Sequence, residues 1–128
     1  MLTEITSGIK ISVVTEYQAS FSNPNALHYV FTYQISIENF SNYTIQLLSR
    51  HWSIIDSNGE VREVEGEGVV GEQPILEPNE KYSYVSGCNF KSPIGKMQGV
   101  YKMERLLDGS HFDVKVPDFV MIVPFLLN

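Results

Sequence analysis

The sequence has little cysteine, few basic side chains and no long apolar run, and each shortage excludes a class of protein. The single cysteine, Cys88, cannot form an internal disulfide framework and suits a reducing, cytoplasmic compartment. Nine basic residues against fifteen acidic ones leave a net charge of −6, which argues against a nucleic-acid partner. No apolar run approaches the roughly 20 residues that cross a bilayer, and no secretion signal follows Met1. We therefore expect neither membrane insertion nor secretion.

The residues that are present suit one globular domain over residues 1–128. Apolar residues make up 43% and charged residues 19% of the chain, enough for a self-sufficient core. No stretch keeps a 3.6-residue apolar period, whereas apolar side chains alternate at every second position from Tyr29 to Ile37. Turn signals such as Ser57-Asn58-Gly59 and Asp108-Gly109 separate the alternating runs. This pattern predicts an all-β fold, an antiparallel immunoglobulin-like or fibronectin-III-like β-sandwich of about 7–9 strands, with Trp52 as its core anchor.

The negative charge is concentrated in one segment. Residues 60–80 hold seven glutamates and one base, Arg62, and so carry the whole net charge of −6. Residues 91–105 hold four bases and one acid. A molecule with acidic and basic lobes is electrostatically polarised, although such charges also serve simply to solvate exposed strands and loops.

A glycine motif, Gly66-Glu67-Gly68-Val69-Val70-Gly71, matches the G-x-G-x-x-G pattern of dinucleotide-binding loops. That chemistry needs a helix after the last glycine, because the helix N-terminus attracts the pyrophosphate. Pro74 and Pro78 forbid a continuing helix here, and the neighbouring glutamates repel a bare phosphate. We expect a structural loop followed by extended chain. The alternative is that Gly66, Glu67, Gly68 and Gly71 bind pyrophosphate or a nucleotide together with a divalent cation.

No catalytic residue and no dedicated metal site can be assigned from the spacing of the reactive residues. The three histidines and Cys88 lie far apart in sequence and form no known ligand motif. Carboxylates of the acidic segment could loosely hold Mg²⁺, but a solvated strand explains them with fewer assumptions. Cys88 follows an alternating strand, which favours a buried and inert thiol. We therefore expect no resident cofactor and no enzyme.

Ser49-Arg50-His51-Trp52 places a charge within a strand expected over residues 44–56. Strict alternation puts Arg50 on the buried face with Trp52, so it needs a carboxylate partner, notably Glu63 or Glu65, unless a bulge turns it outward. The functional alternative is a partner-binding patch formed by Arg50, His51 and the glycine loop.

Several blocks closely resemble the ApaG (CorD) family over nearly the whole chain: residues 46–52 (QLLSRHW), residues 66–74 (GEGVVGEQP), residues 86–88 (SGC), Met97-x-Gly99-x-Tyr101 and residues 112–114 (FDV). The resemblance implies a fibronectin-type-III-like sandwich in a small bacterial cytosolic protein. It also implies a link to cobalt and magnesium efflux, and a gene that often accompanies that of diadenosine tetraphosphate hydrolase. Related domains in eukaryotic F-box proteins and in a polymerase-delta-interacting protein look like interaction modules. Pyrophosphate binding has been suggested for the family's glycine motif, which maps onto Gly66, Gly68 and Gly71. Leu126 and Leu127 are left as an apolar tail with no role.

These observations lead to a non-enzymatic protein-interaction module with a protein partner. Its expected surface is the rim carrying residues 66–74 with Arg50 and His51, or an exposed strand edge that accepts a partner strand. Unpaired edge strands would also allow a homodimer, although glutamates and prolines on those edges oppose it. A small-ligand protein that binds pyrophosphate or a nucleotide with a divalent cation is the alternative.

Overall fold

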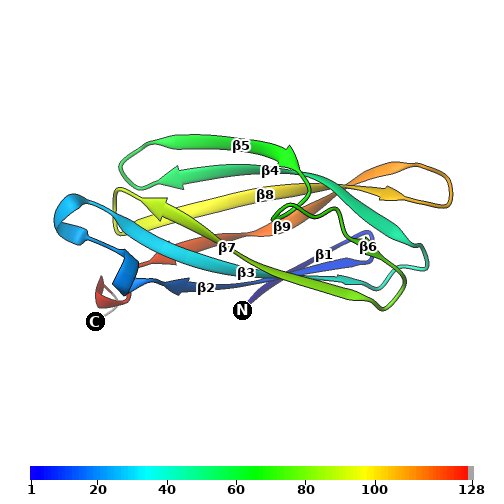
Figure 1. Ribbon diagram of the computed structural model, residues 1–128, viewed down its shortest axis with the longest axis horizontal. Helices are drawn as coiled ribbons and strands as arrows, with labels where there is room; N and C mark the ends of the chain where they lie inside the picture. Colours follow the sequence, from blue (N-terminus) through cyan, green and yellow to red (C-terminus); the bar gives the residue numbers. More distant parts are fainter. Residues whose placement is uncertain (127–128) are drawn as a thin grey trace.

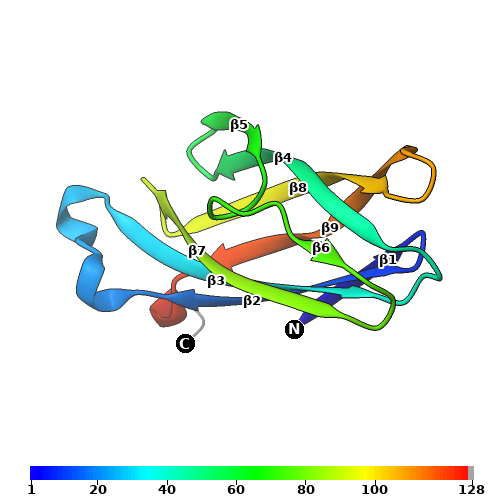
Figure 2. The same ribbon diagram turned by 45° about the vertical axis from the view of Figure 1, so that its right-hand side comes forward.

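Two antiparallel sheets pack face to face in the computed structural model, which describes residues 1–126 (Figures 1 and 2). One sheet has the strand order β1-β2-β3-β7, and the other has the order β5-β4-β8-β9 with the short β6 paired to β4. The predicted antiparallel β-sandwich is confirmed, with nine strands in the described residues. Their bounds are β1 Leu2–Thr6, β2 Ile9–Tyr17, β3 Tyr29–Asn39, β4 Ile45–Asp56, β5 Val61–Glu67, β6 Ile75–Leu76, β7 Lys81–Phe90, β8 Ile94–Arg105 and β9 His111–Ile122.

The core lies between the sheets and is filled from alternating positions. Along β3 every second residue from Tyr29 to Asn39 is buried, as the alternation predicts. Trp52 on β4 is 3% exposed and is the centre of an aromatic cluster. Its ring centroid lies 5.8 Å from that of Tyr33, 6.1 Å from that of Tyr101 and 6.0 Å from that of Phe119. Such edge-on contacts add about 0.5–1.5 kcal/mol each to the stabilisation from burial, which confirms Trp52 as the core anchor.

The Asn58-Gly59 hairpin connects β4 to β5, as the sequence indicates. The Asp56 amide donates to the Glu60 carbonyl at 2.8 Å, and Gly59 adopts a φ of 97°. The buried Asp56 carboxylate accepts the amide of Lys91 at 2.7 Å and the hydroxyl of Ser92. These bonds tie the hairpin to the turn that follows β7, and so fix the position of β5 relative to the other sheet.

Two features depart from the prediction. Residues 2–6 form β1, which the sequence pattern did not indicate because only Leu2 and Ile5 in it are apolar; pairing with β2 provides its regular structure. The expected glycine loop over residues 66–71 also begins later, because β5 continues through Gly66 to Glu67 while paired with β4. The irregular chain therefore starts at Gly68.

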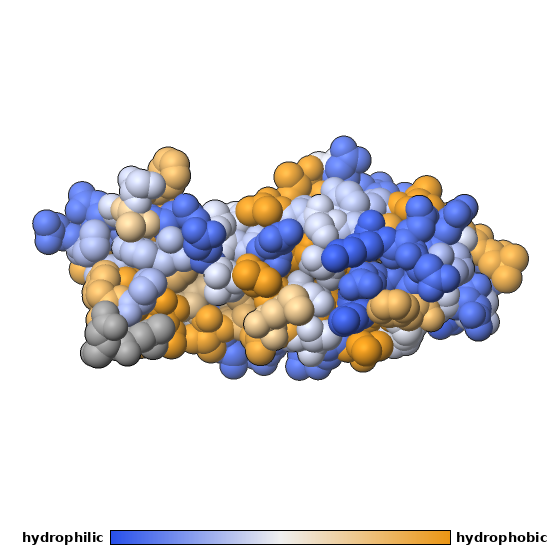
Figure 3. Space-filling model, turned by 90° about the horizontal axis from the view of Figure 1, so that it is seen from below, coloured by the Kyte–Doolittle hydropathy of each residue, from blue (hydrophilic) through white to orange (hydrophobic). Residues whose placement is uncertain are grey.

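Short 3-10 helices lie between β2 and β3 and after β9. The three short 3-10 helices, Ala19–Phe21, Pro24–Ala26 and Pro124–Leu126, are the helices of the described chain, and each is far too short to cross a bilayer. The predicted apolar tail extends to Leu127, which lies outside the described residues. Seen from below, the surface mixes small hydrophobic patches with a larger hydrophilic cluster on its right-hand half (Figure 3).

Candidate functional site

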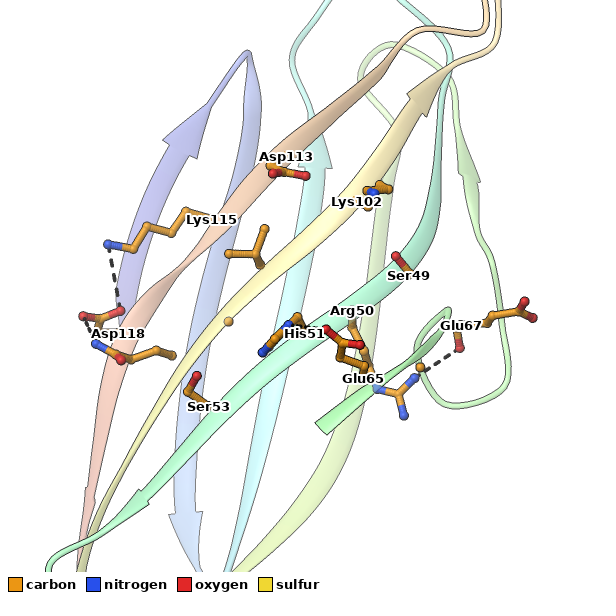
Figure 4. Close-up of a pocket in the computed structure, with 14 residues that line it drawn as sticks. Ser49, Arg50, His51, Ser53, Glu65, Glu67, Lys102, Asp113, Lys115 and Asp118 are labelled. Atoms are coloured by element: carbon orange, nitrogen blue, oxygen red, sulfur yellow. Dashed lines mark hydrogen bonds and ion pairs between the residues drawn. The ribbon is translucent and has the colours of Figure 1, made fainter. Parts of the chain in front are cut away.

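The outer face of the β5-β4-β8-β9 sheet carries an open groove with a volume of about 900 Å³ (Figure 4). Strand register sets its composition. One row across the sheet runs Glu65–His51–Val100–Lys115, and the next runs Glu67–Ser49–Lys102–Asp113. Side chains of β4 and Val100 of β8 therefore form the floor, glutamates of β5 form one wall, and Lys102 of β8 forms the other wall with charged side chains of β9.

The wall on β5 is acidic and is joined to the floor through His51. The Nε2 atom of His51 lies 2.7 Å from Glu63 Oε2, and its Nδ1 atom lies 2.7 Å from Glu65 Oε1. The Ser53 hydroxyl also donates to Glu63, at 2.8 Å. The hydrogen bond with Glu63, followed by the nearby charge of Glu65, raises the pKa of the His51 imidazole above its ordinary value. The same bond lowers the pKa of Glu63.

The opposite wall on β8 and β9 is mixed in charge. Asp118 accepts a hydrogen bond from Gln98 at 3.0 Å and lies 4.0 Å from Lys115 Nζ. Lys102 and Asp113 stand side by side across the β8–β9 ladder, one row further along the groove. The groove thus presents carboxylates on one side and alternating lysines and aspartates on the other.

Arg50 lies on the inner face of β4, while His51 faces the groove. The Arg50 guanidinium donates through Nη1 to the carbonyl oxygens of Glu67 and Gly68, at 3.1 Å each. A Cβ at Gly66 would lie 2.6 Å from Nη1, so this glycine makes room for the guanidinium. The predicted ion pair with Glu63 or Glu65 is therefore wrong, because both carboxylates lie on the outer face beside His51. Backbone carbonyls satisfy the half-buried charge instead.

A β-bulge at Leu48 in β4 anchors the glycine loop. The register with β8 shifts between Leu47 and Ser49, so Leu48 is the extra residue and Arg50 keeps the inward direction of Trp52. The displaced Leu48 carbonyl accepts the amide of Gly68 at 2.8 Å and the side-chain amide of Gln73 at 2.9 Å. The bulge that the sequence left open therefore exists, but it does not turn Arg50 outward.

The glycine loop is a tight turn followed by extended chain. Val69 and Glu72 exchange two backbone hydrogen bonds, at 2.8 and 3.0 Å, around a turn in which Gly71 has a φ of 78°. A Cβ at Gly68 would lie 2.1 Å from the Glu72 carbonyl oxygen. The chain then runs into β6 and opens no helix, as predicted. The amides of Gly68, Val69 and Glu72 are all used inside the protein.

The structure brings most of the predicted site residues together, because Arg50, His51, Gly66 and Glu67 all line the groove. Gly68 and Gly71 lie outside the lining, although the Gly68 carbonyl accepts a hydrogen bond from Arg50. Among residues 1–126, no group of three or more histidine, cysteine, aspartate or glutamate side chains is arranged to hold a metal ion. Cys88 is half-buried, and burial raises the pKa of its thiol.

The lysine side of the groove was missed by the sequence analysis. Lys102 and Lys115 lie thirteen positions apart in the chain and face the same groove only through the β8–β9 pairing. The signal that could have found them is the Asp108-Gly109 turn, because a tight turn fixes which residues of the two strands stand opposite each other.

Comparison with known proteins identifies the family. A family model described as the ApaG domain matches residues 19–105. The chain belongs to the ApaG family. It is 48% identical over 120 residues to the protein ApaG of Thiobacillus denitrificans, covering 94% of each chain. It is 43% identical over 128 residues to the protein ApaG of Anaeromyxobacter dehalogenans, covering both chains fully. The crystal structure of the putative ApaA protein from Bordetella pertussis superimposes with a TM-score of 0.88 at 40% identity, covering 91% of this chain and 94% of that one.

Proposed function

We propose that this ApaG-family chain is a non-enzymatic protein-interaction module, and that it docks its partner in the groove of the β5-β4-β8-β9 sheet. The observation that carries the proposal is the groove itself, which is about 900 Å³ in volume, open, and bordered by an acidic wall and a wall of mixed charge. Sites for small molecules are usually enclosed and mostly apolar. An open, charged groove on a rigid sheet instead favours an extended segment of another protein.

The charge pattern supports selection among partners. Glu65 and Glu67 form one wall, and Lys102 and Lys115 stand in the other beside Asp113 and Asp118. A docked segment gains affinity where its bases face the glutamates of β5 and where its remaining charges are spaced to match the alternating lysines and aspartates of the other wall. A segment that turns its acids toward β5 meets like charges. The link to cobalt and magnesium efflux that the family resemblance implies would then act through the partner.

Crosslinking from inside the groove tests the proposal. A photoreactive phenylalanine analogue is placed at Val100 on the groove floor in one variant and at Val120 in a control. Val120 lies on β9 outside the groove lining and is 49% exposed. We expect crosslinks to one defined protein from position 100 and none from position 120, identified by mass spectrometry.

The second part of the test measures the affinity of each variant for the purified partner that the crosslinking identifies. Val100→Arg fills the groove and is expected to weaken binding by at least about tenfold, because the docked segment loses the space on the floor. Val120→Arg adds the same charge to the same sheet and should leave binding unchanged. Equal binding by both variants, or efficient turnover of a nucleotide by the protein alone, would overturn the proposal.

A further inference from the structure

The outer face of the other sheet differs from the groove face in its charge. Lys10, Glu38 and Lys81 form one row across β2, β3 and β7. Eleven outward positions lie on one side of this row: 12, 14 and 16 on β2, 30, 32, 34 and 36 on β3, and 83, 85, 87 and 89 on β7. Glu16 is the one charged residue among these eleven. By contrast, each of the four long strands under the groove carries outward-facing charged or titratable side chains. The molecule therefore has one nearly uncharged sheet face.

The centre of this face contains exposed valines beside short polar side chains, of which Ser12 is only 6% exposed. Two rows cross it, Ser12–Ser36–Ser83 and Val14–Gln34–Val85. Val14 is 49% exposed and Val85 is 57% exposed. Short side chains let a second sheet approach to the roughly 10 Å spacing at which sheets pack. These two rows will be called the serine–valine rows.

Charged residues border the serine–valine rows and select one arrangement for a second copy. Lys10, Glu38 and Lys81 stand side by side at one border, and Glu16 stands at the other. A two-fold axis lying in the plane of the interface, across the strands at Val13, brings Lys10 of each copy to Glu16 of the other. The same axis places Glu38 and Lys81 over neutral positions. An axis along the strands would instead bring Lys10 against Lys81 and Glu38 against its own copy. Charge complementarity therefore favours the axis across the strands.

The area available is enough for a weak specific dimer. The β2, β3 and β7 strands at about 4.8 Å spacing and about eight residues of length, with the five residues of β1 beside them, give roughly 450 Å² per copy, or roughly 900 Å² in total. This total lies just below the roughly 1,000 Å² of a stable specific interface, and it predicts a dimer that dissociates on dilution.

We infer that the serine–valine rows are the interface of a symmetric homodimer, with two Lys10–Glu16 pairs at its borders. This assembly leaves the groove on the outside of both copies, so it is independent of the proposed function. It also differs from association through strand edges, because the sheets meet face to face.

Sedimentation equilibrium from about 5 to 500 µM, a range that brackets weak association, tests the inference. Val14→Lys places two unpaired ammonium groups in the interface and should weaken the dimer about 30-fold or more. The matched control is Val120→Lys, a valine with the same 49% exposure on the other sheet, and it should leave the dimer unchanged.

A charge exchange tests the orientation. Lys10→Glu and Glu16→Lys alone should each weaken the dimer severalfold, because each brings like charges together twice, and the double variant should recover it. A chain that is monomeric over the whole range would overturn the inference. So would a dimer that survives Val14→Lys, or a double variant no tighter than the singles.

Discussion

Replacing Gly68 by alanine should destabilise the fold far more than the same change at Gly71. Both glycines have positive φ, 63° and 78°, which costs an alanine about 1–2 kcal/mol. Nothing lies within 4 Å of a Cβ at Gly71, whereas a Cβ at Gly68 would lie 2.1 Å from the Glu72 carbonyl oxygen. Relieving that clash breaks the paired bonds between Val69 and Glu72, and a further net loss of about 0.5–1.5 kcal/mol for each bond follows.

The expected cost is therefore roughly 2–5 kcal/mol for Gly68→Ala and about 1–2 kcal/mol for Gly71→Ala. Gly66→Ala should fall between them, because its Cβ displaces the flexible end of Arg50 rather than backbone. For a chain of this size the melting temperatures of the first two variants should differ on the order of 5–10 °C.

Urea unfolding followed by fluorescence gives the free energies directly, since Trp52 is the single tryptophan and is buried in the core. If Gly68→Ala and Gly71→Ala fall within about 0.5 kcal/mol of each other, the steric reasoning is refuted. In that case the glycine pattern needs another explanation, and anion binding would be the first explanation to test.

Three further outcomes follow from the polar contacts. An NMR titration should place the pKa of His51 above 6.5, and Glu63→Gln should lower it; the stability that this raised pKa provides is complete below pH 6.5 and is lost as pH rises through the folded-state value. Asn39→Ala removes a fully buried amide that donates to the carbonyls of Tyr43 and Leu76, and should cost roughly 2–4 kcal/mol in urea unfolding. Arg50→Lys keeps the charge but loses the planar donor geometry, and should cost about 1–2 kcal/mol in the same assay. An unshifted His51 pKa, or unfolding midpoints equal to wild type, would contradict the respective contacts.

Most of the fold could be predicted because its signals are local. Alternation from Tyr29 to Ile37 gave the buried face of β3, and Asn58-Gly59 gave a hairpin, because positive φ is required there. The prolines after Gly71 correctly excluded a helix. Each inference needed only a few neighbouring residues.

The site was harder to predict because its residues meet through register. At the bulge, three residues of β4, from Leu47 to Ser49, stand opposite two residues of β8. No residue type in β4 indicates this irregularity. The Arg50 partners are backbone carbonyls, which no side-chain pattern reveals. Lys115 reaches the groove only through pairing across two strands.

Because of the extra residue Leu48 in β4, the inward direction of the core side chains and the attachment of the glycine loop depend on different residues. Deleting Leu48 would leave Leu47 and Trp52 directed inward, because the shortened strand alternates normally. The carbonyl that holds Gly68 and Gln73 would nevertheless be gone. Such a shortened chain should keep its hydrophobic interior and its concave outer surface, yet release the segment between β5 and β6 from its tether.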